Sequence, residues 1–198
     1  MESSTPEIAQ RDGRLILLLG GARAGKSAHA LRLAREHAAE SKGEVSFIAT
    51  AQALDEEMAA RIARHRAERP PHWLTIEEPY RLDEALRQAG ACSVVIVDCL
   101  TLLVSNWLLA SDSGLAEGEL GLVIERALAL AGAGGQTIIC VSNEVGLGLV
   151  PETPLGRKFR DLLGGVNQRF AQAATEVHLL VAGLSLQLKP ERGGDTQR

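Results

Sequence analysis

The sequence predicts an α/β domain in which helices cover both faces of a mostly parallel β-sheet. Short, continuously apolar segments alternate along the chain with longer segments whose apolar residues recur at helical spacing. Strands that are apolar on both sides belong to sheets buried on both faces, as in parallel sheets joined by crossover helices. In addition, a glycine-rich turn joins the first apolar segment directly to a helical one, a connection that occurs in this class of domain.

Five apolar segments are the expected strands, and a weaker sixth candidate follows them. They lie at 15–19, 45–49, 94–98, 136–141 and 177–182, with the weaker candidate at 184–188. The segment 72–78 is expected only to connect two helices.

Six helices are expected, at 26–40, 55–69, 81–89, 100–110, 118–133 and 156–175. The first and the last carry apolar residues at helical spacing along one face. The second begins with acidic residues, ends with basic ones and is stopped by Pro70-Pro71, as the helix dipole and the geometry of proline favour. We expect 111–117 and 151–155 to be loops.

A chain of 198 residues is long enough for one domain with a substantial core. Residues 14–189 form the predicted domain, and the polar segments 1–13 and 190–198 are expected to be flexible tails. No segment approaches the ~18 consecutive apolar residues of a membrane span, and the polar start lacks the apolar part of a signal peptide. We therefore expect a cytoplasmic protein without membrane insertion.

Composition argues against two kinds of site. The three cysteines, Cys92, Cys99 and Cys140, lie singly in or beside apolar segments, so buried reduced thiols are expected rather than disulfides or metal ligands. The net charge is −4 and only six residues are aromatic. Because a groove for single-stranded nucleic acid needs basic residues and stacking rings, no nucleic-acid partner is expected.

The glycine-rich turn has the spacing G-x-x-x-x-G-K-S, with Gly20, Gly25, Lys26 and Ser27 in the fixed positions. Glycines let backbone N–H groups approach phosphate oxygens without a Cβ in the way. The lysine can bridge the β- and γ-phosphates, and the hydroxyl can bind Mg²⁺. The helix that follows directs the positive end of its dipole at the same anion. The alternative is an ordinary glycine turn, but strand, loop, lysine, hydroxyl and helix are all in register for a nucleotide-binding P-loop.

Other polar residues follow the predicted strands. Ligands of parallel sheets bind at the carboxyl ends of the strands, which would bring Thr50–Gln52, Asp98 and Asn143–Glu144 to the same edge as the P-loop. Asp98 closes an apolar strand, as an acid that holds Mg²⁺ opposite Ser27 would. The alternative for Asp98 is a cap for the next helix.

The helix 55–69 is the second informative segment. Arg61, His65 and Arg69 are spaced by four residues, and Arg64 and Arg66 flank the histidine. The four arginines would favour a neutral imidazole and attract a triphosphate, and a neutral imidazole facing phosphorus is a potential covalent catalyst. The alternative is a surface helix that packs Met58, Ile62 and His65 against the domain.

With these motifs in hand, the chain resembles the bifunctional adenosylcobinamide kinase/adenosylcobinamide-phosphate guanylyltransferase family. The resemblance covers about 14–189 and rests on segments in a fixed order: Gly20–Ser27, Ile48–Gln52, Glu57–His65, Arg69–Trp73, Val97–Thr101, Ser142–Gly146, Val150–Glu152, Phe159–Asp161 and Val166–Arg169. Two positions depart from it. Many members have serine at the position of Ala24, and some have a second histidine at that of Arg64, so the nucleophile is carried by His65 alone.

The resemblance implies two reactions at one nucleotide site, in a RecA-like P-loop NTPase domain assembled as a homotrimer. The kinase step phosphorylates adenosylcobinamide with ATP or GTP. The transferase step passes GMP from GTP, through His65, to adenosylcobinamide phosphate. Motif and resemblance together select the nucleotide-binding residues Gly20, Gly21, Ala22, Arg23, Ala24, Gly25, Lys26, Ser27, Thr50, Ala51, Gln52, Arg66, Ala67, Glu68, Arg69, Glu77 and Asp98, with Ser27 and Asp98 as ligands of Mg²⁺. Glu77 and Glu78 follow the turn at Trp73, and either could instead face solvent.

Two other functions fit the P-loop alone. A kinase of another small alcohol would use Lys26 and Asp98 but would need no histidine. A nucleotide-driven switch protein would have a conformational change as its only product.

Overall fold

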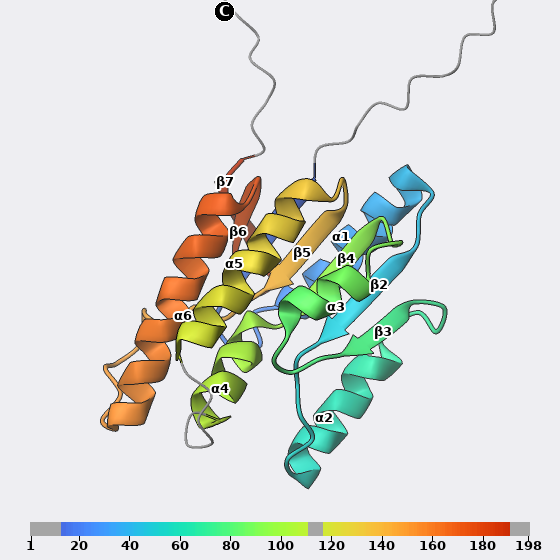
Figure 1. Ribbon diagram of the computed structural model, residues 1–198. Helices are drawn as coiled ribbons and strands as arrows, with labels where there is room; N and C mark the ends of the chain where they lie inside the picture. Colours follow the sequence, from blue (N-terminus) through green and yellow to red (C-terminus); the bar gives the residue numbers. More distant parts are fainter. Residues whose placement is uncertain (1–12, 111–116, 191–198) are drawn as a thin grey trace, which may run out of the picture.

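The computed structural model describes residues 13–110 and 117–190 (Figure 1). The predicted tails 1–13 and 190–198 and the loop 111–117 lie outside these residues, apart from Gly13, Pro190 and Glu117. One seven-stranded sheet runs through the described chain in the order β3-β2-β4-β5-β1-β6-β7. All neighbouring strands are parallel except β6 and β7. The predicted mostly parallel sheet is therefore confirmed.

The six predicted helices and the six predicted strands are all present, with boundaries that differ by a few residues. The strands are β1 (Arg14–Gly20), β2 (Val45–Ala49), β3 (Leu74–Glu77), β4 (Val94–Asp98), β5 (Thr137–Val141), β6 (Glu176–Val181) and β7 (Leu184–Lys189). The helices are α1 (Lys26–Ser41), α2 (Glu56–Ala67), α3 (Leu82–Gln88), α4 (Leu100–Ala110), α5 (Glu117–Ala133) and α6 (Pro154–Ala173).

The prediction that 72–78 contains no strand is wrong, because β3 lies within it and pairs with β2. This strand has only four residues and sits at the edge of the sheet. Of its side chains only Ile76 is buried. It therefore lacks the continuous apolar run by which the central strands are recognised in a sequence.

Alternate residues of the central strands contribute to two separate apolar layers. In β1, Leu15 and Leu17 join a core with α3, α4, α5 and α6, whereas Ile16 and Leu18 join a smaller core with α1. Figure 1 shows the four helices on the near face and α1 behind the sheet. The prediction of helices on both faces is thus confirmed, with most of the apolar burial on the four-helix side.

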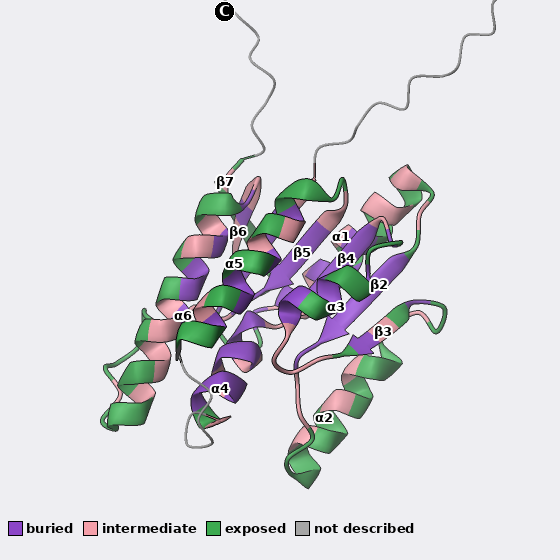
Figure 2. Cartoon of the chain, viewed as in Figure 1, coloured by how far each residue is buried: buried purple, intermediate pink, exposed green. Residues whose placement is uncertain are grey.

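Helix α2 belongs to neither layer. It projects past the carboxyl edge of the sheet, and none of its residues is buried (Figure 2). Asp55 caps its first turn by accepting a hydrogen bond from the Met58 N–H at 2.7 Å. Met58, Ile62 and His65 are the half-buried residues of α2 and the rest of the helix is exposed, as the alternative of a surface helix with one packed face predicts.

Two further sequence expectations can be compared with the structure. All three cysteines are free; Cys92 and Cys140 are buried, and Cys99 is partly exposed. Within the described ranges, no helix combines the length and apolar character that a membrane span requires.

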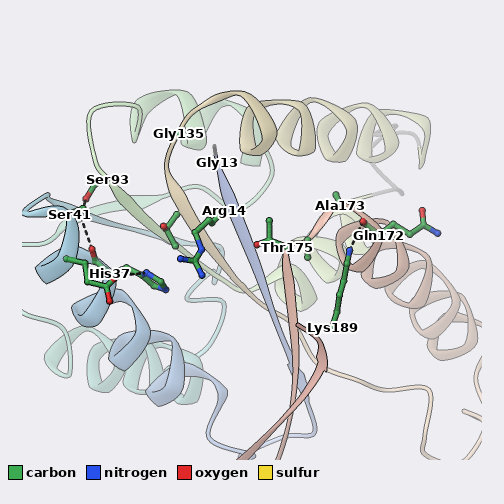
Figure 3. Close-up of a pocket in the computed structure, with 13 residues that line it drawn as sticks. Gly13, Arg14, His37, Ser41, Ser93, Gly135, Gln172, Ala173, Thr175 and Lys189 are labelled. Carbon is green, nitrogen blue, oxygen red and sulfur yellow. Dashed lines mark hydrogen bonds and ion pairs between the residues drawn. The ribbon is translucent and has the colours of Figure 1, made fainter. Parts of the chain in front are cut away.

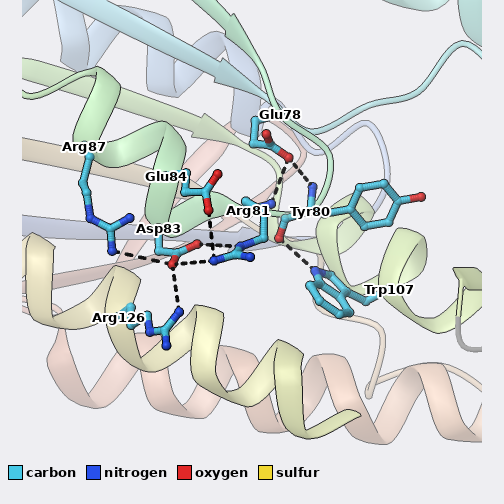
Figure 4. A network of polar contacts seen from close by, with 8 residues as sticks. All are labelled: Glu78, Tyr80, Arg81, Asp83, Glu84, Arg87, Trp107 and Arg126. Atoms are coloured by element: carbon cyan, nitrogen blue, oxygen red, sulfur yellow. Dashed lines mark hydrogen bonds and ion pairs between the residues drawn. The ribbon is translucent and has the colours of Figure 1, made fainter. Parts of the chain in front are cut away.

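A buried carboxylate joins α3 to α5. The side chain of Asp83 is fully buried, and it pairs with Arg81 at 3.3 Å and with Arg87 and Arg126 at 3.7 Å each (Figure 4). Burial raises the pKa of Asp83, but the hydrogen bonds and charge of Arg81 and the charge of Arg87 outweigh it and leave the pKa lowered. Because the folded state lowers this pKa, the ion pairs stabilise the fold above the unfolded pKa of about 3.9 and lose their effect as the pH falls below it.

The variant Asp83→Asn should lower the free energy of unfolding by about 2 kcal/mol at neutral pH, because it removes the buried carboxylate charge that pairs with Arg81, Arg87 and Arg126. Urea denaturation between pH 7 and pH 3 measures this difference, which should shrink toward acidic pH. Glu84→Gln is the matched control: Glu84 is about half exposed and pairs with the same Arg81 at 3.0 Å, so its loss should be close to zero. Equal effects of the two variants would contradict the importance of the buried carboxylate.

Candidate active site

The carboxyl ends of four neighbouring strands bring the predicted site residues to one edge. Ala49 of β2 lies opposite Asp98 of β4, and Val141 of β5 lies opposite both Asp98 and Leu18 of β1. The segments that follow these strands are therefore adjacent. The predicted meeting of the P-loop with Thr50–Gln52, Asp98 and Asn143–Glu144 at one edge is confirmed.

The P-loop, Gly20–Ser27, has glycine where the backbone requires it. Gly20 has φ +152°, and a Cβ there would lie 2.4 Å from the Leu180 oxygen. Gly25 has φ +94°, and a Cβ there would lie 3.3 Å from the Cα of Gly183 in the β6–β7 turn. The N–H of Gly183 donates to the Ala24 oxygen at 3.1 Å. The β6–β7 hairpin thus packs against the P-loop and leaves no room for a side chain at Gly20 or Gly25.

Lys26 starts α1 and is only 8% exposed. Its ammonium donates to the carbonyl oxygens of Gly20 at 2.9 Å and Gly21 at 2.7 Å. Burial is the largest cause of a lowered pKa at Lys26; nearby Cys99 and Asp98 oppose this shift, and Arg61 adds to it. The P-loop lysine, the acid at the end of β4 and an arginine of α2 therefore lie within electrostatic range of one another.

Thr50 organises the backbone around Asp98. Its hydroxyl donates to the Cys99 oxygen and accepts from the Cys99 N–H, both at 2.8 Å. Its own N–H donates to the Asp98 oxygen at 3.2 Å. Because Thr50 is fully buried, its side chain holds the end of β4 in place, while Ala51 and Gln52 continue the loop toward solvent.

Two residues of α4 that the sequence analysis did not single out hold the neighbouring loops. The buried amide of Asn106 donates to the Thr50 oxygen at 2.8 Å and the Pro79 oxygen at 3.0 Å. The Trp107 indole donates to the Tyr80 oxygen at 2.9 Å, and the Tyr80 hydroxyl accepts from Gln52 at 3.1 Å. The sequence does contain a signal for Asn106, because a single amide side chain in a mostly apolar helix is buried only where it finds hydrogen-bond partners.

Arg61 in α2 and Arg69 just beyond its end indicate which side of this helix faces the nucleotide site. The charge of Arg61 contributes to the lowered pKa of Lys26. The guanidinium carbon of Arg69 lies 3.4 Å from the centre of the Phe47 ring in β2. Burial lowers the pKa of Arg69 and Asp98 opposes the shift, so Arg69 is near the end of β4. His65 follows Arg61 by one turn on the same side of α2, and Arg69 lies just beyond the end of the helix. It is half-buried, and within the described chain its imidazole has no hydrogen-bond partner.

The remaining residues selected from the sequence lie toward solvent. Arg66 and Glu77 are both mostly exposed and pair with each other at 3.4 Å. Ala67 and Glu68 are exposed at the end of α2. These residues border the site without a contact to the P-loop in the described structure.

Ser27 and Asp98 are suitable ligands for Mg²⁺. Both are half-buried and offer oxygen atoms at the same sheet edge, and Mg²⁺ uses one or two protein oxygens together with waters and substrate phosphates. In residues 13–110 and 117–190, no group of three or more His, Cys, Asp or Glu side chains could hold a metal ion. The oxygen atoms of Ser27 and Asp98 therefore suit an Mg²⁺ ion that is bound together with the phosphates of the nucleotide.

The other end of the strands has a cavity of about 680 Å³, lined by residues that include Arg14, His37 and Lys189 (Figure 3). Its charged groups already have partners within the fold. Arg14 pairs with Glu176 at 2.8 Å, His37 lies 3.5 Å from Glu40, and Lys189 donates to the last carbonyls of α6. This cavity is at the opposite end of the sheet from the P-loop and contains none of the predicted site residues.

Sequence similarity to known proteins identifies the family of this chain. Residues 16–188 match the family model described as cobinamide kinase / cobinamide phosphate guanyltransferase. The chain belongs to this family. It is 49% identical over 178 residues to the bifunctional adenosylcobalamin biosynthesis protein CobP of Pseudomonas aeruginosa, covering 88% of this chain and 97% of the relative. It is 40% identical over 185 residues to the protein of the same description, CobU, of Escherichia coli K12, covering 88% and 99%.

Among solved structures, the flagellar accessory protein FlaH of Methanocaldococcus jannaschii has a similar fold. The TM-score is 0.54 at 18% identity, covering 91% of this chain and 80% of that chain. This likeness concerns the fold alone. Together with the sheet order and the P-loop, it confirms the predicted α/β P-loop class for this member of the cobinamide kinase family.

Replacing Lys26 by alanine should weaken binding of a fluorescent GTP analogue by tenfold or more, because the loop loses its only buried ammonium beside the phosphate-binding N–H groups. Titration by fluorescence anisotropy, with the melting temperature as a check of folding, measures the effect. Unchanged affinity in a folded variant would show that nucleotide binds elsewhere.

Proposed function

We propose that this chain phosphorylates adenosylcobinamide with ATP or GTP and then transfers GMP from GTP to adenosylcobinamide phosphate, giving adenosylcobinamide-GDP. The observation that carries the proposal is the match to the cobinamide kinase / cobinamide phosphate guanyltransferase family over 16–188. A P-loop with a buried lysine, next to an acid and an arginine, supports it at the level of chemistry. Both reactions would use one triphosphate site.

In the kinase step, the hydroxyl oxygen of the substrate attacks the γ-phosphorus and the bond to the β-phosphate oxygen breaks. Such a transfer depends mainly on positioning and on charge stabilisation. Lys26 and the N–H groups of the P-loop would hold the phosphates. Ser27 and Asp98 would hold Mg²⁺, which supplies positive charge beside the transferring group.

In the transferase step, His65 would attack the α-phosphorus of GTP and displace pyrophosphate. The neutral imidazole avoids bringing two anionic phosphates together at one phosphorus, and it forms a phosphoramidate that the acceptor phosphate then cleaves. Arg61 of α2 and Arg69 just beyond its end support this role because their charges can balance that of the triphosphate.

Two further parts of the proposal rest on other grounds: the homotrimer on the family resemblance, and the cytoplasmic location on the polar start of the sequence. The subunits would assemble as a homotrimer, and the enzyme would work in the cytoplasm. The remaining nucleotide contacts would come from Gln52, from Arg66 to Arg69 and from Glu77.

Labelling with GTP that carries ³²P at the α-phosphate distinguishes the alternatives. The bifunctional enzyme should retain acid-labile label on the protein. A P-loop kinase of another alcohol or a nucleotide-driven switch should retain none after denaturation.

The variant His65→Ala should abolish this covalent label and guanylyl transfer while most kinase activity persists, because direct attack of a hydroxyl on the γ-phosphorus needs no protein nucleophile. His37→Ala removes a histidine at the opposite end of the sheet; it is the matched control and should still be labelled. Label on His65→Ala would place the nucleophile elsewhere, with His72 as the next candidate.

Exchanging Asp98 for asparagine should raise the Mg²⁺ concentration needed for half-maximal turnover by about tenfold, since a carboxylate ligand becomes neutral. Stability should change less, because Thr50 bonds the backbone of this segment and not the carboxylate. Magnesium titrations of both activities, with thermal unfolding in parallel, measure this. A magnesium titration identical to that of the parent protein would contradict the assignment of Asp98 as a ligand of Mg²⁺.

A further inference from the structure

The kinase step releases a proton from the attacking hydroxyl, and the acidic residues at the carboxyl edge differ in their availability to accept it. Glu77 pairs with an arginine. One oxygen of Glu78 accepts the N–H groups of Tyr80 and Arg81, at 2.9 Å each. Asp98 is the proposed ligand of Mg²⁺. Glu144 also binds a backbone N–H with one oxygen, but it follows β5, the strand beside β1, whereas Glu78 follows β3 at the edge of the sheet.

The backbone of Glu144 lies directly beside the P-loop lysine. Strand β5 lies between β4 and β1, so its end separates Asp98 from Gly20. The Glu144 N–H donates to the Gly20 oxygen at 3.1 Å, and the Lys26 ammonium donates to the same oxygen at 2.9 Å. The lysine of a P-loop reaches the β- and γ-phosphates, so Glu144 flanks the space where the γ-phosphate is transferred.

The carboxylate of Glu144 is held without being neutralised. It is half-buried, and one oxygen accepts the Gly146 N–H at 2.6 Å. A Cβ at residue 146 would lie 2.8 Å from that oxygen, so glycine there permits this position. In the described part of the chain, no arginine, lysine or histidine pairs with Glu144. The second oxygen is thus available to a hydroxyl group.

We propose that Glu144 is the catalytic base of the kinase step. Its carboxylate accepts the proton of the substrate hydroxyl while the new O–P bond forms at the γ-phosphorus and the bond to the leaving nucleoside diphosphate breaks. This inference rests on the proposed kinase activity. It concerns that step alone, because the acceptor in guanylyl transfer is a phosphate oxygen that is already largely deprotonated at neutral pH.

The test is Glu144→Gln, assayed for each reaction separately. Glutamine keeps an oxygen for the Gly146 N–H but cannot take the proton. Kinase kcat should fall by about 100-fold or more, while the KM for the nucleotide stays close to that of the parent. Guanylyl transfer to supplied adenosylcobinamide phosphate, and covalent labelling from GTP, should be retained.

Two companion variants separate catalysis from general effects. Glu56→Gln removes the same charge from an exposed position in the first turn of α2, and both activities should be retained. Gly146→Ala keeps Glu144 but displaces its carboxylate, so kinase activity should again fall more than guanylyl transfer.

Three outcomes overturn the inference. Kinase kcat of Glu144→Gln near the parent value would show that another group takes the proton. Equal loss of both activities would show that Glu144 only supports the shared P-loop. A parent protein that has guanylyl transfer but no kinase activity would contradict the proposed kinase and this base together, whereas the first two outcomes leave the proposed function intact.

Discussion

The arrangement of the site depends on the hydrogen bonds that the carbonyl oxygen of Gly20 accepts. This oxygen accepts hydrogen bonds from the Lys26 ammonium and from the Glu144 N–H, so it joins the P-loop to the segment after β5. The bond from Glu144 requires β5 to lie beside β1, and the sheet order provides this, whereas the bond from Lys26 is made within the P-loop. An exposed carbonyl could bond to water at little cost, but at the end of a buried strand it needs these partners. The attachment of the segment after β5 to the phosphate-binding loop is therefore a consequence of strand order.

Around this contact, the molecule combines a rigid edge with one weakly attached helix. Thr50 and Asn106 connect the ends of β2 and β4 and the loop after β3 through buried hydrogen bonds. Helix α2, in contrast, has no buried residue; its Arg66 pairs with Glu77 of β3, and Arg69, just beyond the helix, covers Phe47 of β2. A helix attached in this way can present its histidine and arginines to the nucleotide without being part of either core. This division suits a site proposed to perform two transfers with one triphosphate.

Much of the site could be predicted because its chemistry depends on short-range spacing. The P-loop and the acid of β4 each stand at the end of a continuous apolar strand, so both motif and place could be recognised. The structural roles of Thr50 and Asn106 could not, because their partners lie 49 and 56 residues away in the chain. Strand β3 was missed since an edge strand of four residues has no apolar run. The half-buried face of α2, formed by Met58, Ile62 and His65, could be read from the helical spacing of these residues.

By itself, the sequence determined the α/β class, the phosphate-binding loop and the family, since these follow from local patterns of side chains. Only the tertiary structure decided the strand order, the pairing of Asp83 with three arginines and the position of Glu144 against the P-loop. The physical reason is that these depend on hydrogen bonds and ion pairs between segments distant in the chain. Parallel strands joined by helices can be ordered in several ways with the same local pattern, and each order would place a different residue beside Lys26.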